Sequence, residues 1–155
     1  LSASYLLQTA NAGNFRFSGS HSWVERHRRQ LNPGDAWEDM LDVSYYYASP
    51  RIKSNLGVNW DKNQWGGSLF GTYLGRMANF NNDASISSSW NFNAGARYDV
   101  NDHLRIALSV NNLFDKMPVN DPTWRNYPYY DTSWFDSLGR SYYVQFTWKL
   151  GGEAL

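Results

Sequence analysis

The sequence contains no cysteine, carries few charges and has no long hydrophobic run. Without cysteine, the chain can form neither a disulfide framework nor a thiolate metal site. Lys and Arg together number 14, as do Asp and Glu, so no net charge attracts nucleic acid and we expect no such partner. No apolar stretch approaches the roughly 18 residues that a membrane-spanning helix needs, and the mean hydropathy is −0.62. Helical membrane spans are therefore excluded.

The patterns of common enzyme and metal sites are also missing. His21, His27 and His103 do not have the spacing of metal ligands, and the sequence contains neither a nucleophile elbow nor a phosphate-binding loop. The acidic pair Glu38-Asp39 lies in a predicted loop, where solvated charge is the usual state. We therefore expect that the chain is not an enzyme and binds no cofactor.

Aromatic residues, in contrast, are in excess. They make up 17% of the chain and include 8 Trp and 11 Tyr. Trp and Tyr rings settle at the headgroup level of membranes, so a protein that crosses both boundaries of a bilayer carries many of them. A low mean hydropathy is compatible with a membrane β-barrel, because a barrel strand presents only every second residue to lipid.

Four segments alternate between apolar and polar residues with a period of two, which is the pattern of β-strands. They are residues 51–60, 90–99, 104–111 and 142–149. No residue on the four apolar faces is charged, whereas six residues on the opposite faces are. A Lys or Arg facing the bilayer midplane costs about 2–4 kcal/mol, so the lipid-facing side of a barrel strand is expected to carry no charge. A soluble sheet packed on a core alternates in the same way, so the faces alone leave both folds open.

In a membrane barrel, the apolar faces would point to lipid and the others into the lumen. The residues expected to face lipid are Leu56, Val58, Phe92, Ile106, Leu108, Val144 and Phe146, and those expected in the lumen are Arg97, Arg105 and Lys149. Weaker alternation marks further strands at Ala3–Gln8, Phe15–Arg26 and Gln64–Arg76. Leu41–Tyr47 also alternates, and we interpret it as the upper part of the strand that continues from Arg51.

The connections distinguish the two folds. Asn11–Asn14, Asp61–Asn63 and Asn101–His103 are short and rich in Asn, Asp and Gly, as tight hairpin turns require. Long connections, roughly 27–47, 77–87 and 116–138, alternate with them. Membrane barrels alternate short periplasmic turns with long external loops, whereas a soluble sandwich has no reason to sort its loops by rim. The pattern predicts an all-β, antiparallel transmembrane β-barrel segment of about seven strands, the last of which runs toward the periplasm.

Aromatic residues also gather near the short turns and the end of the last strand. In the predicted barrel they would form one girdle at the periplasmic boundary of the membrane. Its members would be Phe15, Trp60, Trp65, Tyr98 and Trp148.

Two motifs near the C-terminus resemble the TonB-dependent receptors of the outer membrane. Asn112, Leu113, Phe114 and Asp115, followed by Lys116, resemble the NLFDK segment on the penultimate strand of that family. After a long aromatic loop, Gly139-Arg140-Ser141-Tyr142 resembles the GR-x-Y/F start of the last strand. The resemblance covers about Ser88 to Leu150, and the loop between the motifs is similar to the Oar-like branch.

The resemblance implies active uptake across the bacterial outer membrane by a 22-stranded barrel. Such a barrel holds an N-terminal plug, whose TonB box couples it to TonB. Leu1 does not begin a signal peptide, and neither plug nor TonB box is present. We therefore expect a fragment, with residues 1–150 as the C-terminal barrel segment and 151–155 as a short tail. The implied partners are the rest of the barrel and plug, TonB, the barrel-assembly machinery, outer-membrane lipid and lipopolysaccharide, and a substrate.

The resemblance also suggests an assembly signal. Family members end on an aromatic residue that the barrel-assembly machinery reads together with the alternating residues before it. In this chain Tyr142, Val144, Phe146 and Trp148 would form that signal, with the short tail after it. The family pattern differs here, because the terminal aromatic is not the last residue.

Two sets of residues are candidates for contacts outside the barrel. In the last long loop, Trp124, Tyr127, Tyr129, Tyr130 and Trp134 would stack on sugars or an aromatic siderophore, or would pack the loop against its neighbours. Near the end of an earlier strand, Arg26, Arg28 and Arg29 would bind lipopolysaccharide phosphates, because a guanidinium group can donate two parallel hydrogen bonds to phosphate oxygens. Alternatively, they would be solvated charges at the base of a loop.

Three functions remain open at this stage. The first is a TonB-coupled transporter, the second a passive channel or small complete barrel of about eight strands, and the third a soluble β-sheet binding module. A fragment of a large barrel has two open edges, so Ala3–Gln8 and Tyr142–Lys149 should not pair with each other. Pairing between them would indicate the small closed barrel.

Overall fold

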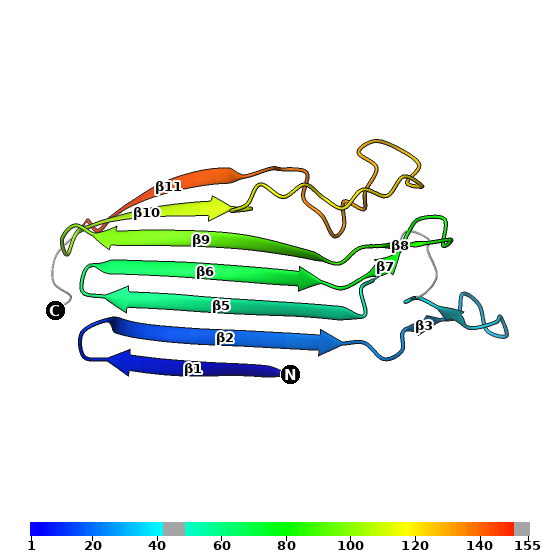
Figure 1. The fold of residues 1–155 in the computed structure, drawn as a ribbon, viewed down its shortest axis with the longest axis horizontal. Helices are drawn as coiled ribbons and strands as arrows, with labels where there is room; N and C mark the ends of the chain where they lie inside the picture. Colours follow the sequence, from blue (N-terminus) through cyan, green and yellow to red (C-terminus); the bar gives the residue numbers. More distant parts are fainter. Residues whose placement is uncertain (42–48, 151–155) are drawn as a thin grey trace.

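The computed structural model describes residues 1–41 and 49–150 and shows one antiparallel sheet of seven strands (Figure 1). In spatial order the strands are β1 (Ser2–Thr9), β2 (Gly13–Trp23), β5 (Ile52–Lys62), β6 (Trp65–Leu74), β9 (Ser89–Asp99), β10 (Leu104–Asn111) and β11 (Ser141–Trp148). Two small hairpins pair β3 (Arg28–Arg29) with β4 (Glu38–Asp39), and β7 (Met77–Ala78) with β8 (Ser85–Ile86). The described residues include no helix that is long and apolar enough to cross a membrane.

The sheet is open. In the part of the chain that the structure describes, β1 pairs with β2 alone and β11 with β10 alone, so these two strands lie at opposite edges. The prediction that they do not pair with each other is confirmed, and these strands do not form a small closed barrel. Residues 42–47 of the predicted segment Leu41–Tyr47 lie outside the described residues.

Short and long connections alternate, as predicted, and the short ones lie together at one end of the sheet (Figure 1). Asn63 adopts a positive φ of 51° in the two-residue turn between β5 and β6, which hairpin turns of this length require. Gly13, with φ 91°, starts β2 where a Cβ would overlap the Asp61 carbonyl. The Trp60 indole N–H donates to the Ala12 carbonyl at 2.7 Å and ties the first turn to β5.

The strand register places most of the large apolar side chains of the seven strands on one face, while Leu6, Phe70 and Tyr143 lie on the other. One row of paired residues crosses the whole sheet through Tyr5, Phe17, Val58, Leu69, Ala94, Val110 and Tyr142. The residues predicted to face lipid all share this face, and Arg97 and Arg105 lie on the opposite one. Lys149 follows the end of β11, where its backbone N–H donates to the His103 carbonyl at 2.8 Å.

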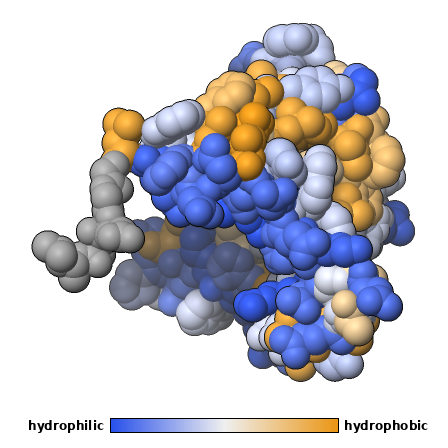
Figure 2. Space-filling view, turned by 90° about the vertical axis from the view of Figure 1, so that its left-hand side faces the viewer, coloured by the Kyte–Doolittle hydropathy of each residue, from blue (hydrophilic) through white to orange (hydrophobic). Residues whose placement is uncertain are grey.

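A view along the strands from the short-turn end shows how the two faces are separated. Hydrophobic residues gather along the outer side of the molecule, and hydrophilic residues gather on the side toward the hollow (Figure 2). A barrel wall with lipid outside and a polar lumen inside has this distribution. We call the two sides the apolar face and the polar face.

The buried hydrophobic core lies outside this sheet wall. Its described members are Met40, Leu41, Leu74, Met77, Ile86, Tyr130 and Phe135, all at or beyond the strand ends that carry the long connections. The sequence predicted loops in this region but no core. We refer to residues 75–88 and 112–140 together as the loop cap.

Candidate functional site

The last long loop begins with a tight turn that the first family motif forms. β10 ends at Asn111, and Asn112 adopts a positive φ of 50°. Both polar groups of the Asn112 side chain bond to Lys116, because its oxygen accepts the Lys116 N–H at 2.8 Å and its amide donates to the Lys116 carbonyl at 2.9 Å. Its backbone N–H donates to the side-chain oxygen of Asn93 on β9 at 2.9 Å. The motif therefore ends the strand and anchors the loop to the neighbouring strand.

The second family motif closes the same loop from the other side. The Asp115 carboxylate accepts the backbone N–H of Arg140 at 2.8 Å, and a Cβ at Gly139 would lie 2.9 Å from the same oxygen. The Arg140 guanidinium donates instead to the Leu113 carbonyl at 3.4 Å and lies 5.9 Å from the Tyr142 ring. Asp115 and Arg140 therefore meet through a backbone hydrogen bond, and the close approach at this point explains why a glycine precedes the arginine.

The loop cap has a hydrophobic core of its own. Residues from the end of β6, from the β7–β8 hairpin and from the last loop pack into one cluster. Its buried members are Leu74, Met77, Ile86, Tyr130 and Phe135, with Val119 and Trp134 packed against them. Two loops that are far apart in sequence therefore fold together.

Asp121 fastens these two loops to each other. Its side chain is buried, with a relative exposure of 1%. One carboxylate oxygen accepts the Phe80 N–H at 2.7 Å, and the other accepts both the backbone N–H and the hydroxyl of Thr123 at 2.9 and 2.6 Å. The Thr123 hydroxyl accepts the Asn81 N–H at 3.2 Å, and the Trp124 ring lies 5.3 Å from that of Phe80. The sequence placed Asp121 in the last long loop but did not predict this contact, although Asp-x-Thr is a pattern that favours such local turns.

The five aromatic residues predicted to contact a ligand occupy different environments. Tyr130 is buried in the loop-cap cluster, and Trp124 packs within the cap. Tyr127 is exposed and its ring lies 6.2 Å from that of Tyr129. Trp134 faces a cavity. Packing within the loop, the alternative that the sequence left open, therefore describes Trp124 and Tyr130.

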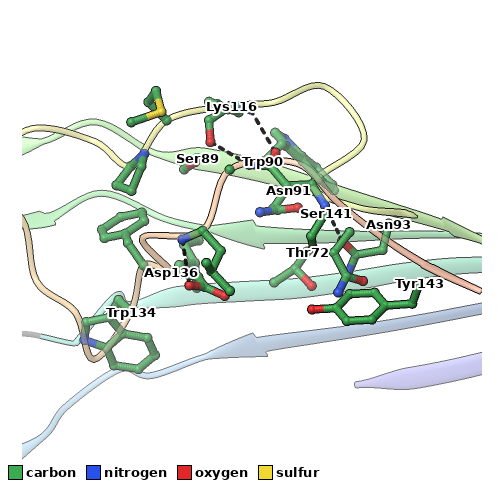
Figure 3. A pocket seen from close by; sticks show the side chains of 18 residues that line it. Thr72, Ser89, Trp90, Asn91, Asn93, Lys116, Trp134, Asp136, Ser141 and Tyr143 are labelled. Carbon is green, nitrogen blue, oxygen red and sulfur yellow. Dashed lines mark hydrogen bonds between the residues drawn. The ribbon is translucent and has the colours of Figure 1, made fainter. Parts of the chain in front are cut away.

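That cavity lies beneath the last loop, at the outer end of the polar face (Figure 3). Its volume of about 370 Å³ lies in the range of small-ligand pockets. Four adjacent strands contribute its uncharged polar wall, namely Thr72, Ser89, Asn91, Asn93, Asn111, Ser141 and Tyr143. From the loop side it is lined by Lys116, Met117, Pro118, Trp134, Phe135, Asp136 and Leu138. We call it the outer cavity.

Charged side chains gather at the other end of the polar face. Arg97 forms ion pairs with Asp61 and, at 2.9 Å, with Asp99, which also pairs with Arg105. Gly66 lies beneath the Arg97 side chain, where a Cβ would overlap the guanidinium. These contacts join β5, β9 and β10 near the short turns. The polar face is therefore divided into an inner end with several ion pairs and an outer end with fewer charges, where the Lys53 ammonium lies 5.6 Å from the centre of the Trp134 ring.

The arginines predicted to reach lipopolysaccharide lie near the first small hairpin. Arg29 forms an ion pair with Glu38 at 3.0 Å across β3 and β4. Arg26 and Arg28 are exposed. The hairpin itself is held to the preceding segment by the Met40 N–H, which donates to the His27 carbonyl at 2.7 Å.

The aromatic residues of the apolar face form two bands. The predicted inner girdle lies at the short-turn end, where the Trp65 and Tyr98 rings are 4.5 Å apart. A second band, which the sequence analysis missed, lies toward the opposite strand ends, where the Tyr73 and Trp90 rings are 5.1 Å apart. Along β6 and β9, eight residues separate the two bands. At about 3.3 Å per residue this is roughly 26 Å along a strand, comparable with a barrel's apolar band of about 25 Å.

Comparison with known proteins gives a family match and several similar structures. The family model described as TonB dependent receptor-like, beta-barrel, matches residues 1–113. The sequence matches no curated protein. A mutant of the ferric enterobactin receptor PfeA from Pseudomonas aeruginosa is 16% identical, with a TM-score of 0.60, and the match covers 95% of this chain and 21% of that one. The copper transporter OprC is 14% identical, with a TM-score of 0.54, and the match covers 95% of this chain and 22% of that one.

The similarity of this chain to these two solved structures is a similarity of fold. At these identities, they show that the seven-stranded sheet has the shape of a segment of such a barrel. This chain spans about a fifth of the length of either structure, because the matches cover 21% and 22% of them.

Proposed function

Because this chain belongs to the TonB-dependent receptor β-barrel family, we propose that the whole protein transports a substrate actively across the outer membrane. The family is one of receptors and transporters in the bacterial outer membrane, and the chain has that location. In this proposal, residues 1–150 supply the C-terminal strands of a 22-stranded barrel, and residues 151–155 are a short tail.

One observation carries the proposal: the apolar face runs without interruption across all seven strands and ends at two open edges. An unpaired backbone group in an apolar environment costs a few kcal/mol, so β1 and β11 need further partners within lipid. Additional strands of the same protein would provide them and close the barrel. A soluble binding module would have no use for an exposed apolar face of this extent.

The proposed partners follow from the same arrangement. The plug would fill the lumen against the polar face, and TonB would act through the plug. The barrel-assembly machinery would read β11, whose proposed signal residues are exposed on the apolar face at an open edge. Their exposed fractions are 61% for Tyr142, 59% for Val144, 67% for Phe146 and 59% for Trp148. Lipid and lipopolysaccharide would then cover this face.

Active transport and passive conduction can be separated without knowing the substrate. We would purify the full-length protein in detergent, measure its binding to the periplasmic domain of TonB, and record its conductance in planar bilayers. Active transport predicts that TonB binds and that the plugged barrel shows no steady open conductance. A steady conductance without TonB binding would overturn the proposal in favour of a passive channel.

The assembly role of β11 needs a separate experiment. Trp148→Ala in the full-length protein should lower the amount of folded protein in the outer membrane several-fold, because it removes the proposed signal aromatic. Deletion of residues 151–155 is the matched control and should have a smaller effect. Equal losses would show that the chain terminus, and not Trp148, is recognised.

A further inference from the structure

The outer cavity differs from the rest of the polar face in its charge. The ion pairs of Arg97 and Arg105 lie at the short-turn end, whereas the strand residues that line the outer cavity are uncharged. The loop side adds Lys116 and Asp136, whose charges are opposite in sign. The residues that line the cavity therefore carry no net charge, and one further cation, Lys53, lies beside it with its ammonium 5.6 Å from the centre of the Trp134 ring.

The uncharged lining has unused hydrogen-bonding groups. Across the described parts of the chain, the side chains of Asn91, Asn111 and Tyr143 have no protein hydrogen-bond partner. Asn93 uses its oxygen for the Asn112 N–H but keeps its amide donors. An Asn amide offers two donors and one acceptor group, and a Tyr hydroxyl offers both functions. Figure 3 shows Asn91, Asn93 and Tyr143 beneath the last loop.

We propose that the outer cavity is a subsite for a neutral polyhydroxylated ligand, namely an oligosaccharide. Sugar hydroxyls both donate and accept hydrogen bonds, which matches a wall of amides and hydroxyls. Tyr143 supplies aromatic surface from β11, and Trp134, whose ring also contacts the Lys53 ammonium, supplies further aromatic surface from the loop. An anionic ligand such as a ferric catecholate would instead be met by a cluster of Arg guanidinium and Lys ammonium groups. The proposal rests on the proposed function, since it names the substrate class of that transporter.

The test uses the full-length protein in detergent and isothermal titration calorimetry. The probes are neutral malto-, cello-, xylo- and manno-oligosaccharides, with ferric enterobactin as the anionic comparison. Each titration is made at about 50 mM and about 500 mM salt, because an interaction between charges weakens as the Debye length shrinks. The proposal predicts that at least one neutral oligosaccharide binds, with the same affinity at both salt concentrations.

Substitutions then locate the bound sugar. Asn91→Ala and Tyr143→Phe should each weaken binding by about 2- to 10-fold, as expected for the loss of a hydrogen bond. Asn59→Ala is the matched control, because Asn59 is also an amide on the polar face but lies toward the charged end. It should change the affinity by less than about twofold, and circular dichroism should show the same β content for all variants.

Three results would overturn the proposal. They are the absence of binding to every neutral oligosaccharide, tighter binding of ferric enterobactin that weakens with salt, and sugar binding that Asn91→Ala and Tyr143→Phe leave unchanged. TonB binding, measured on the same preparation, separates this proposal from the previous one. If TonB binds but no oligosaccharide does, the proposed substrate class is wrong and the proposal of active transport stands. If an oligosaccharide binds but TonB does not, the proposal of active transport is wrong and the sugar subsite stands.

Discussion

In the seven-stranded sheet, Leu56 and Phe146 are 53% and 67% exposed, whereas in the loop cap Met77 and Ile86 are 5% and 7% exposed. The sheet places its large apolar side chains on an outer face, and the cap places them inside. The difference teaches that the two regions are stabilised by different surroundings. The sheet depends on lipid outside and on paired strand edges, while the cap excludes water from its own small core.

The largest expected effect comes from placing a charge on the apolar face. Leu108→Arg puts a guanidinium near the middle of β10 on that face, which should cost about 2–4 kcal/mol in lipid. Its neighbour Ser109 points to the polar face, so Ser109→Arg is the matched control and should cost much less. Urea unfolding of the full-length protein in lipid vesicles measures both. Equal destabilisation would mean that the faces are not divided between lipid and lumen.

A smaller effect, confined to the cap, is expected from Asp121→Ala. The substitution leaves the partly buried N–H groups of Phe80 and Thr123 without their acceptor, which should cost about 1–3 kcal/mol. Hydrogen exchange should accelerate at both amides and stay unchanged in β9 and β10. Asp136→Ala is the control, because among the described residues the exposed Asp136 carboxylate accepts only the Leu138 N–H, at 2.9 Å. Faster exchange in the strands as well would show that the cap and the sheet are not independent.

The smallest effect should arise where the last loop closes. Gly139→Ala would bring a Cβ to 2.9 Å from the Asp115 carboxylate, so it should destabilise the loop by about 1 kcal/mol. In the background Asp115→Ala the same change should cost less, since the oxygen is gone. A double-mutant cycle with loop hydrogen exchange as the readout measures the coupling. Strict additivity would show that the two motifs do not meet through this contact.

The strands of the sheet could be predicted from the sequence because the pattern that marks each strand lies within the strand itself. Alternation with a period of two marked residues 51–60 and 104–111, and the observed strands are Ile52–Lys62 and Leu104–Asn111. The alternation of short, Asn-rich turns with long connections predicted the direction of the strands, and the structure places the short turns together at one end of the sheet. The outer aromatic band was missed, although Trp65 and Tyr73, and likewise Trp90 and Tyr98, are eight residues apart in the same phase.

The cap and the cavity were not accessible in this way. Asp121 and Phe80 are 41 residues apart, and nothing periodic in either loop indicates that they meet. The motif residues Asp115 and Gly139 were found by resemblance, but their contact appears only once the loop is closed. Asn91 and Tyr143 were visible as members of polar faces. That they share a cavity depends on the last loop folding over the strands, which no local pattern encodes.

The division of the sheet into a lipid face and a lumenal face is tested most directly on β10. This chain has no cysteine, so once any cysteine elsewhere in the full-length protein is replaced by Ser, single Cys substitutions at positions 105–110 can carry a spin label at a defined place. In lipid vesicles, labels at 106, 108 and 110 should collide more with oxygen, and labels at 105, 107 and 109 more with a water-soluble nickel complex. Collision rates that do not alternate along the strand, or that alternate with the opposite phase, would contradict the account.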